Sequence, residues 1–282
     1  MRTLSIGKTP LVMGILNCTP DSFFSGGRAD SRAAAVDQAR EIIRSGADIL
    51  DIGGESSRPG SDAVSLSTEL ERVLPVLEEI RAFSDIPISV DTRKTEVARR
   101  ALLAGADIIN DISALHEGPE KADIAAEHGA ALVLMHMRGT PATMQNAPFY
   151  QDTVGEILNE LQPAVELARK AGVPQNGIIL DPGIGFAKRL EDNIAVLREI
   201  PRLRSSGFPI LIGHSRKSFL GTLLSDEDGH ARPVGERLSG GLAVSLFAAA
   251  QGASVLRVHD VAETVDALKV GLFLSSPGES DR

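Results

Sequence analysis

The sequence has very little of the chemistry that crosslinks a protein or builds a thiol-based metal site. It contains one cysteine, Cys18, one tyrosine and no tryptophan among 282 residues. A lone cysteine cannot form an internal disulfide, and without a cluster of thiols no structural zinc site is expected. This cysteine usage is typical of a reducing compartment, and we expect the cytoplasm.

Long apolar runs are also missing. The run nearest the N-terminus covers only residues 11–16, which is too short for a secretory signal. The longest apolar-rich stretch, 242–250, is interrupted by Ser245 and is far shorter than the roughly 20 residues that a membrane span requires. We therefore expect no signal peptide and no membrane segment.

Positive charge is in deficit, with 29 Lys and Arg against 38 Asp and Glu and a formal net charge of −9. Such a balance argues against a general nucleic-acid or anionic-membrane surface, so any anion site must be local. With 43% hydrophobic and 24% charged residues, disordered and fibrous classes are excluded. We expect one globular domain over residues 1–282, with 275–282 as a frayed tail.

What the sequence does contain is a series of short runs rich in Val and Ile, separated by stretches with helical spacing. The eight runs are 11–16, 48–52, 86–90, 107–110, 132–135, 178–180, 210–212 and 254–258. Their spacing, about 35 residues per unit, is the size of a strand with its crossover helix. The pattern predicts an α/β fold with a parallel sheet.

A short phrase recurs where a helix should end and a strand should begin, at 46–50, 105–109, 129–133 and 252–256. Its glycine supplies the left-handed conformation that ends a helix. The repetition favours a (β/α)8 TIM barrel, with long loops at 17–30 and 53–66 after the first two strands. A doubly wound open sheet is the alternative, but no GxGxxG follows the first run. Loops of this length are either functional lids or mobile insertions.

Polar side chains end nearly every run, at the edge where a barrel of this kind builds its active site. The residues at the run ends are Asn17, Asp51, Asp91, Asn110 with Asp111, Met135 with His136, Asp181, Gly213 with His214 and Ser215, and Arg257 with His259. Any one of them can instead satisfy loop backbone groups. Together with Arg58 and Lys217 they predict a site for a hydrogen-bond-rich heterocycle joined to an anion.

Some of these residues allow a sharper prediction. Arg257 and His259 are two apart in a strand and project to the same side, so they can grip one anion, although an ion pair with a carboxylate is the alternative for Arg257. Lys217 has the wrong charge for a helix N-terminus, so we expect it to point at a carbonyl or carboxylate in the barrel mouth. The turn at 181–186 should bring Phe186 over that mouth. Cys18 has no base near it in sequence and is interpreted as a packing residue.

Eight segments of the chain, taken together, resemble the dihydropteroate synthases, a family of folate-pathway enzymes that sulfonamides inhibit. They are MGILNCTPDSF (13–23), DIGGESSRPG (51–60), SVDT (89–92), GADIINDIS (105–113), LMHMRGTP (134–141), DPGIGF (181–186), GHSRKSFLG (213–221) and RVHDV (257–261). The resemblance implies a transferase that joins 6-hydroxymethyl-7,8-dihydropterin diphosphate to 4-aminobenzoate and releases pyrophosphate. The chain departs from the family's usual residues at Cys18, Phe24, Ser25 and Ser57, all within the two long loops.

The same resemblance implies a role for each matching residue. The pterin would contact Asp91, Asn110, Met135, Asp181, Gly213 and Lys217. The diphosphate would contact Asn17, Ser57, Arg257 and His259, with Asn17 acting through Mg²⁺. The aminobenzoate would contact Ser57, Arg58, Phe186, Lys217 and Ser218. The residues implied in catalysis are Asp91, Lys217, Arg58, Arg257 and His259.

Two other functions fit parts of the pattern. A methyltetrahydrofolate-dependent methyltransferase that serves a corrinoid partner would share the barrel and the pterin pocket, but it needs no diphosphate grip. A non-catalytic pterin-binding paralogue would typically have lost loop residues, whereas Asn17, Arg58 and Lys217 are present. The helix expected at 235–252 has wide small-residue coverage, which is consistent with a homodimer or with plain packing on the barrel; the resembled family is usually dimeric.

Overall fold

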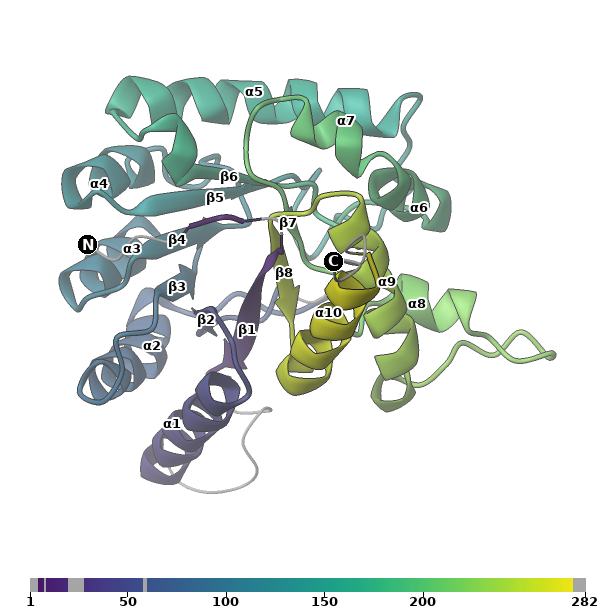
Figure 1. Cartoon of the computed structure of the whole chain (residues 1–282). Coiled ribbons are helices and arrows are strands. Elements are labelled where there is room, and N and C mark those ends of the chain that lie inside the picture. The colour runs from purple at the N-terminus through teal and green to yellow at the C-terminus, as the bar shows by residue number, and fades with distance from the viewer. Residues whose placement is uncertain (1–4, 8, 20–27, 58–59, 276–282) are drawn as a thin grey trace, which may run out of the picture.

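Strands and helices alternate along the whole chain in the computed structural model, which describes residues 5–7, 9–19, 28–57 and 60–275 (Figure 1). The strands are β1 (Leu11–Asn17), β2 (Ile49–Gly53), β3 (Ile88–Asp91), β4 (Ile108–Asp111), β5 (Ala131–Met135), β6 (Ile178–Asp181), β7 (Leu211–Ile212) and β8 (Val255–Val258). Every expected strand is present, and no end differs from the expected position by more than two residues.

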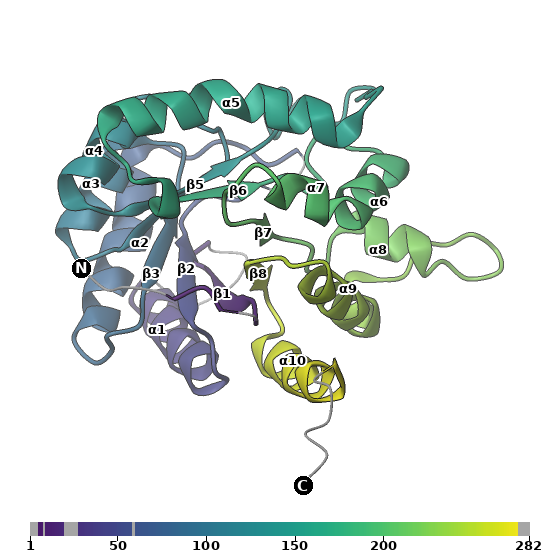
Figure 2. The ribbon, with the colours of Figure 1, turned by 45° about the horizontal axis from the view of Figure 1, so that its top comes forward.

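The helices lie outside the strands in Figures 1 and 2. They are α1 (Arg28–Arg44), α2 (Leu66–Arg81), α3 (Thr95–Leu103), α4 (Lys121–His128), α5 (Thr153–Ala171), α6 (Leu190–Arg198), α7 (Ile200–Arg204), α8 (Ser218–Leu223), α9 (Leu238–Ala250) and α10 (Val261–Ser275). Short 3₁₀ turns cover Gln175–Gly177 and Val234–Glu236. The expected helix at 235–252 therefore begins only at Leu238.

The strands form one parallel sheet in the order β6-β5-β4-β3-β2-β1-β8-β7. A further parallel bridge between Leu180 and Ile210 joins its two edges, so the sheet closes on itself (Figure 2). Each strand except the last returns to its neighbour through at least one helix. This is the predicted (β/α)8 barrel, and the open doubly wound sheet was the wrong alternative.

The recurring glycine phrase has the predicted geometry. Gly46, Gly105, Gly129 and Gly252 have φ values of +91°, +103°, +61° and +91°. At this φ a side chain with a Cβ is strained, so glycine lets each helix end and the next strand begin within two or three residues. The repeated phrase thus sets the short return connections beneath the barrel.

Two layers of apolar side chains make up the core. The first fills the barrel itself and consists of Met13, Ile49, Ile108, Val133, Ile179, Leu211 and Val255. The second lies between strands and helices, where Leu50 and Leu77 are fully buried. Burying such a side chain stabilises a fold by about 1.5–3 kcal/mol. Because apolar side chains fill the barrel, a ligand can bind only beyond the strand ends.

The first long loop was expected at 17–30, but α1 already begins at Arg28, and between β1 and α1 the structure describes only residues 18 and 19. The second expected loop lies between Gly53 at the end of β2 and Leu66 at the start of α2. Phe24, Ser25, Arg58 and the tail from 276 onward lie outside the described residues. Within the described residues no helix combines the length and apolar character that a membrane crossing requires. The cytoplasmic location stays a prediction.

Candidate active site

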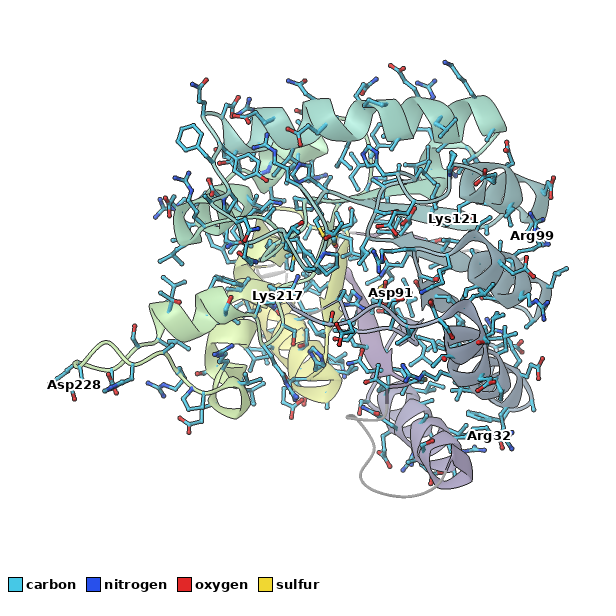
Figure 3. The ribbon with its side chains drawn as sticks, turned by 180° about the vertical axis from the view of Figure 1, so that it is seen from behind. Arg32, Asp91, Arg99, Lys121, Lys217 and Asp228 are labelled. Atoms are coloured by element: carbon cyan, nitrogen blue, oxygen red, sulfur yellow. The ribbon has the colours of Figure 1, made fainter. Side chains whose placement is uncertain are left out.

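The polar site is built by strand alternation. Side chains two residues apart in a strand share a face, so the positions two residues after the apolar layer also point into the barrel. These positions are Asp51, Asn110, Met135, Asp181, Gly213 and Arg257, and Asp91 stands at the same level on β3 by its register with Asn110. Asp91 and Lys217 are labelled near the middle of the molecule in Figure 3. The structure thus gathers predicted site residues from many strands at one barrel end.

Arg257 contacts two carboxylates at the centre of this end. Its Nε donates to Asp51 Oδ2 at 2.6 Å, and its Nη2 donates to Asp91 Oδ2 at 2.9 Å. Burial disfavours the guanidinium charge, but Asp51 and Asp91 outweigh burial and raise the pKa of Arg257. Burial and the neighbouring carboxylates raise the pKa of Asp91, against the opposing effect of Arg257. The ion-pair alternative for Arg257 is therefore present alongside its place in the pocket.

Asn110 extends this polar floor, because its Nδ2 lies 3.3 Å from Asp51 Oδ2. Its neighbour Asp111 points elsewhere: Oδ1 accepts the Ser113 N–H at 2.9 Å, and Oδ2 lies 3.2 Å from the fully buried Lys121 Nζ. Adjacent strand residues face opposite sides, which explains this division. Asp111 stabilises the turn after β4, which is the alternative role expected for a polar residue at a strand end, namely to bond loop backbone groups.

Asp181 and Lys217 lie near enough to each other at the barrel end that each shifts the other's pKa. Asp181 Oδ1 accepts the Gly183 N–H at 2.7 Å, and Lys217 Nζ donates to the Ile184 carbonyl at 2.5 Å. The prediction that Lys217 turns away from its own helix toward a carbonyl is confirmed, although Lys217 is the N-cap of α8 rather than a residue of its first turn. Burial lowers the pKa of Lys217 to about 8, opposed by Asp181.

Phe186 forms an apolar wall beside Lys217. The Lys217 ammonium lies 4.5 Å from the centre of the Phe186 ring, and this ring packs in a cluster with Met135 and Ile112. Gly183 and Gly185 have φ values of +69° and +81°, which turn the chain back toward the barrel as predicted. The polar pocket at Lys217 is therefore bordered by the apolar ring of Phe186.

Gly213 leaves room in this pocket. A Cβ there would stand 3.8 Å from Asp181 Oδ2 and 3.9 Å from the Cβ of Arg257. Ser218, the first residue of α8, is exposed nearby. His259 follows β8 and its Nδ1 lies 3.1 Å from the Ser215 hydroxyl, so the ends of β7 and β8 are joined.

The two long loops meet this end through their described residues. Ser57 lines a small cavity with Asp91, Thr92 and Ile112. Asn17 ends β1 opposite Gly53, where a Cβ would lie 4.0 Å from Asn17 Oδ1 and 3.7 Å from Asp91 Cβ. Cys18 is buried in the apolar core, and burial raises its pKa to about 12. A thiol of that pKa is a poor nucleophile, in agreement with its predicted packing role.

The sequence assigned no individual role to several buried charged residues, among them Asp51, Lys188 and Glu69. Asp51 stood only as a run end and is the partner that Arg257 and Asn110 share. Lys188 is buried beneath the turn at Phe186 and donates to its carbonyl and to His136 Nδ1, both at 3.0 Å. Glu69 is fully buried on α2 and accepts from Thr92. The spacing of these charges along the sequence held no signal for the contacts, because the partners come from different elements.

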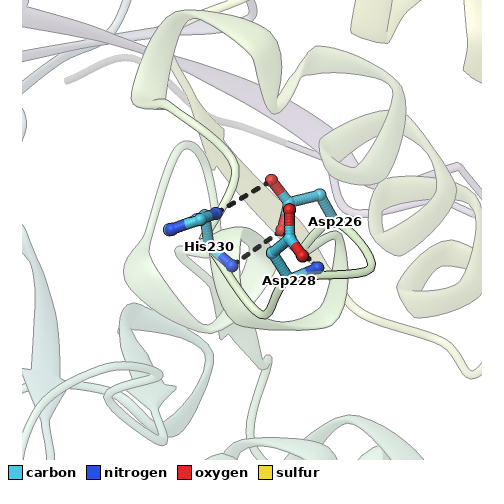
Figure 4. A group of neighbouring side chains, drawn as sticks. All are labelled: Asp226, Asp228 and His230. Atoms are coloured by element: carbon cyan, nitrogen blue, oxygen red, sulfur yellow. Dashed lines mark hydrogen bonds and ion pairs between the residues drawn. The ribbon is translucent and has the colours of Figure 1, made fainter.

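One group among the described residues has the spacing of metal ligands, and it lies far from the barrel end. It comprises Asp226, Asp228 and His230, all exposed, on the loop after α8 (Figure 4). Asp226 Oδ1 accepts the backbone N–H groups of Asp228 and His230, so these contacts account for a turn. Figure 3 shows Asp228 at the tip of this loop, away from Asp91.

A parallel barrel with carboxylates, a lysine and an arginine at its strand ends has the architecture of a TIM-barrel enzyme. The family of pterin binding enzymes matches residues 13–259 of the chain. The dihydropteroate synthase of Synechocystis sp. is 50% identical over 264 residues, which cover 94% of this chain and 90% of that protein. That of Escherichia coli K12 is 47% identical over 275 residues, which cover 97% and 94% of the two chains.

Solved structures agree. The Yersinia pestis dihydropteroate synthase, determined with a sulfonamide drug, has a TM-score of 0.88 and 41% identity, covering 98% of this chain and 97% of that one. The Xanthomonas albilineans enzyme with 4-aminobenzoic acid has a TM-score of 0.88 and 44% identity, covering 96% and 94%. The chain therefore belongs to the pterin binding enzymes and, within them, to the dihydropteroate synthase family.

Proposed function

We propose that the protein joins 6-hydroxymethyl-7,8-dihydropterin diphosphate to 4-aminobenzoate, giving 7,8-dihydropteroate and pyrophosphate. One observation carries this proposal: Asp181, Lys217 and Arg257 meet at one barrel end, where they provide acceptors for a heterocycle beside cations for an anion. The Xanthomonas albilineans relative that was solved with 7,8-dihydropteroate, at 41% identity and a TM-score of 0.85, supports the same product.

The pterin would lie between the carboxylates of β3 and β6. A pterin presents an amino group beside a ring N–H, and one carboxylate can accept both donors. Asp181 suits this because Oδ1 already accepts from Gly183, which orients Oδ2 toward Gly213. Lys217 would donate to the ring carbonyl or nitrogen. Completing the pocket are Asp91, Asn110, Met135 and Gly213.

The diphosphate would lie toward β1 and β8. Arg257 and His259 offer donors there, and Ser57 offers a hydroxyl from the second long loop. Asn17 fits a magnesium ion, because it places a neutral amide oxygen beside the Asp91 end of β3 and Mg²⁺ takes oxygen ligands, mostly water. When bound, the ion would help to neutralise the charge of the diphosphate.

The aminobenzoate would bind against Phe186, whose ring forms the apolar wall beside Lys217. Ser57, Arg58 and Ser218 would complete its site from the second loop and the start of α8. This arrangement places the aromatic amine between the pterin side and the loop side. Sulfonamides, which carry a similar aromatic amine, would compete for the same surface.

The reaction forms a bond from the amine nitrogen to the exocyclic methylene carbon and breaks the bond from that carbon to the diphosphate oxygen. The electron pair of the broken bond leaves with pyrophosphate, and the amine proton passes to solvent. Arg257 and His259 would stabilise the departing charge. Asp91 would stabilise positive charge on the pterin as the bond breaks, so the amine needs no general base.

A steady-state assay of pyrophosphate release separates this function from the alternatives. We expect release that depends on both substrates. A methyltransferase would leave the diphosphate intact and would instead consume methyltetrahydrofolate with a corrinoid acceptor. A non-catalytic paralogue would bind the pterin without turnover.

We also propose a homodimer through α9 and α10. These helices contact each other and expose several large apolar side chains, namely Leu238, Leu246, Phe247, Val270, Leu272, Phe273 and Leu274. Water-exposed apolar surface of this extent on neighbouring helices is typical of an interface. Analytical ultracentrifugation should show a dimer, and Phe247→Glu should give a monomer.

A further inference from the structure

The second long loop is held at both of its ends by one lysine. The loop connects Gly53 at the end of β2 to Leu66 at the start of α2. Glu55 lies just after its start, and Glu69 lies in the first turn of α2, just beyond its end. Lys94 Nζ contacts both carboxylates, forming an ion pair with Glu55 and donating to Glu69 Oε2 at 2.6 Å.

These contacts are largely shielded from solvent. The side chains of Glu55 and Glu69 are 11% and 1% exposed, and that of Lys94 is 25% exposed. Burial alone would raise the pKa of Glu55, but the hydrogen bonds from Lys94 and Arg93 hold it low. Burial alone would lower the pKa of Lys94, but its hydrogen bonds to Glu55 and Glu69 hold it high. Both groups therefore stay charged and paired.

Further contacts fix the frame in which Lys94 sits. Arg93 pairs with Glu55 and, at 2.8 Å, with Glu117. The carbonyl of Arg93 accepts from the buried Lys121 at 2.5 Å, and Thr92 donates to Glu69 at 2.5 Å. The turn after β3 is thus rigidly attached to α2 and α4. Since this turn begins directly after Asp91, the two ends of the second long loop are fixed relative to the Asp91 carboxylate.

This anchor lies beside the site. Ser57 is two residues beyond Glu55, and both line the same small cavity as Asp91 and Thr92. Fixing both ends of a loop reduces the conformational freedom that must be lost when the loop orders on a ligand. Supporting contacts of this kind decide whether a binding group is held in its productive position.

We propose that Lys94 is a positioning residue for the binding of 4-aminobenzoate. Lys94 holds the two ends of the second long loop beside Asp91, so that Ser57 is presented to 4-aminobenzoate. The inference rests on the proposed function. Lys94 does not touch either substrate in this account; it acts through Glu55 and Glu69. Its loss should therefore affect the aminobenzoate side of the site and spare the pterin side.

The test compares Lys94→Met, Lys94→Arg and the control Arg100→Met, which removes an exposed ion pair with Glu96 on the same helix. In Lys94→Met we expect the KM for 4-aminobenzoate to rise by about ten- to a hundredfold, the range expected when a substrate contact is slightly misplaced. The dissociation constant of free hydroxymethylpterin, which lacks the diphosphate that Ser57 would contact, should stay within about twofold when it is measured by calorimetry, because its proposed contacts lie at the strand ends rather than on the loop. Lys94→Arg should restore most of the loss, and Arg100→Met should match the wild type.

An unchanged KM for 4-aminobenzoate in folded Lys94→Met would overturn the proposal, and so would an equal weakening of 4-aminobenzoate and of free hydroxymethylpterin. If Lys94→Met does not fold, Glu55→Gln provides the same comparison, because it weakens only the loop side of the anchor; the same two outcomes then decide. Absence of turnover in the wild type would instead refute the proposed function, so the two failures are distinguishable.

Discussion

Arg257 donates through Nη2 to Asp91 Oδ2 at 2.9 Å, so the cation proposed for the diphosphate and a carboxylate proposed for the pterin already contact each other. The Nε of the same guanidinium stays on the fully buried Asp51. A diphosphate that binds beside Arg257 would therefore contact a guanidinium that Asp51 holds in place. The pairing couples the two halves of the first substrate through one side chain.

Arg257→Ala should therefore have two effects. It should weaken the diphosphate ester far more than free hydroxymethylpterin, because only the ester presents an anion to Arg257. It should also lower the free energy of unfolding by about 3–5 kcal/mol, because Asp51 and Asp91 lose the partner of a buried pair. Calorimetry with both pterins and chemical denaturation check these effects. Equal weakening of both pterins would remove Arg257 from the diphosphate site.

Asp181→Asn should nearly abolish pterin binding. A carboxylate has two acceptor oxygens, whereas an amide has one oxygen and an NH₂ group. The Asn side chain would therefore leave one pterin donor facing the NH₂ group, which costs about 2–4 kcal/mol of binding free energy. Asn193→Ser would be a poor control, because Asn193 Oδ1 accepts the N–H of Gly185 in the neighbouring turn. Gln162→Ala, on the exposed side of α5, serves as the control. A dissociation constant that is unchanged in Asp181→Asn would exclude Asp181 from the pterin site.

The pKa of Lys217 gives a prediction for pH dependence. Its ordinary value of 10.5 is lowered to about 8, so the free enzyme loses the Lys217 ammonium as the pH rises through that value. We expect kcat/KM for the pterin diphosphate to fall over the same range. Lys217→Arg should move the fall to higher pH, because a guanidinium stays charged.

Lys188 offers the competing assignment, since burial lowers its pKa to about 7. An alkaline fall that persists in Lys217→Arg but disappears in Lys188→Met would assign the titration to Lys188. A fall that keeps its position in both variants would contradict a role for either lysine.

The order of binding is a further prediction. The proposed pterin contacts lie on or next to β3, β4, β6 and β7, whereas Ser57 belongs to the second long loop. We expect 4-aminobenzoate to bind measurably only when pyrophosphate or the pterin diphosphate is present with Mg²⁺, because that ligand orders the loop. Both long loops should become protease-resistant in the same step. Tight aminobenzoate binding to the ligand-free protein without magnesium, with the loops still cleavable, would contradict this coupling.

The barrel and its polar end could be predicted because they depend on local patterns. Alternation within a strand determines which residues face inward, and the glycines at 46, 105, 129 and 252 determine where β2, β4, β5 and β8 begin. Strand ends such as Asp91 and Asp181 lie within the ladders rather than after them, because their backbone groups still pair with a neighbouring strand. These small shifts keep the same residues at the barrel end.

The charge pairing could not be predicted, because it depends on which elements the closed barrel brings together. Asp51 and Arg257 are 206 residues apart, and Glu55 and Lys94 are 39 apart. The sequence held several candidate partners for each cation, and only the strand order selects among them. The buried lysines Lys121 and Lys188 look like surface residues in the sequence, since nothing local marks a lysine for burial.

The most direct test of the account follows both products in one reaction. The protein is mixed with 6-hydroxymethyl-7,8-dihydropterin diphosphate, 4-aminobenzoate and Mg²⁺, and pyrophosphate and 7,8-dihydropteroate are quantified in the same quenched samples. We expect equal amounts of the two products at every time point and neither product without 4-aminobenzoate. Pyrophosphate without dihydropteroate, or no product with both substrates present, would contradict it.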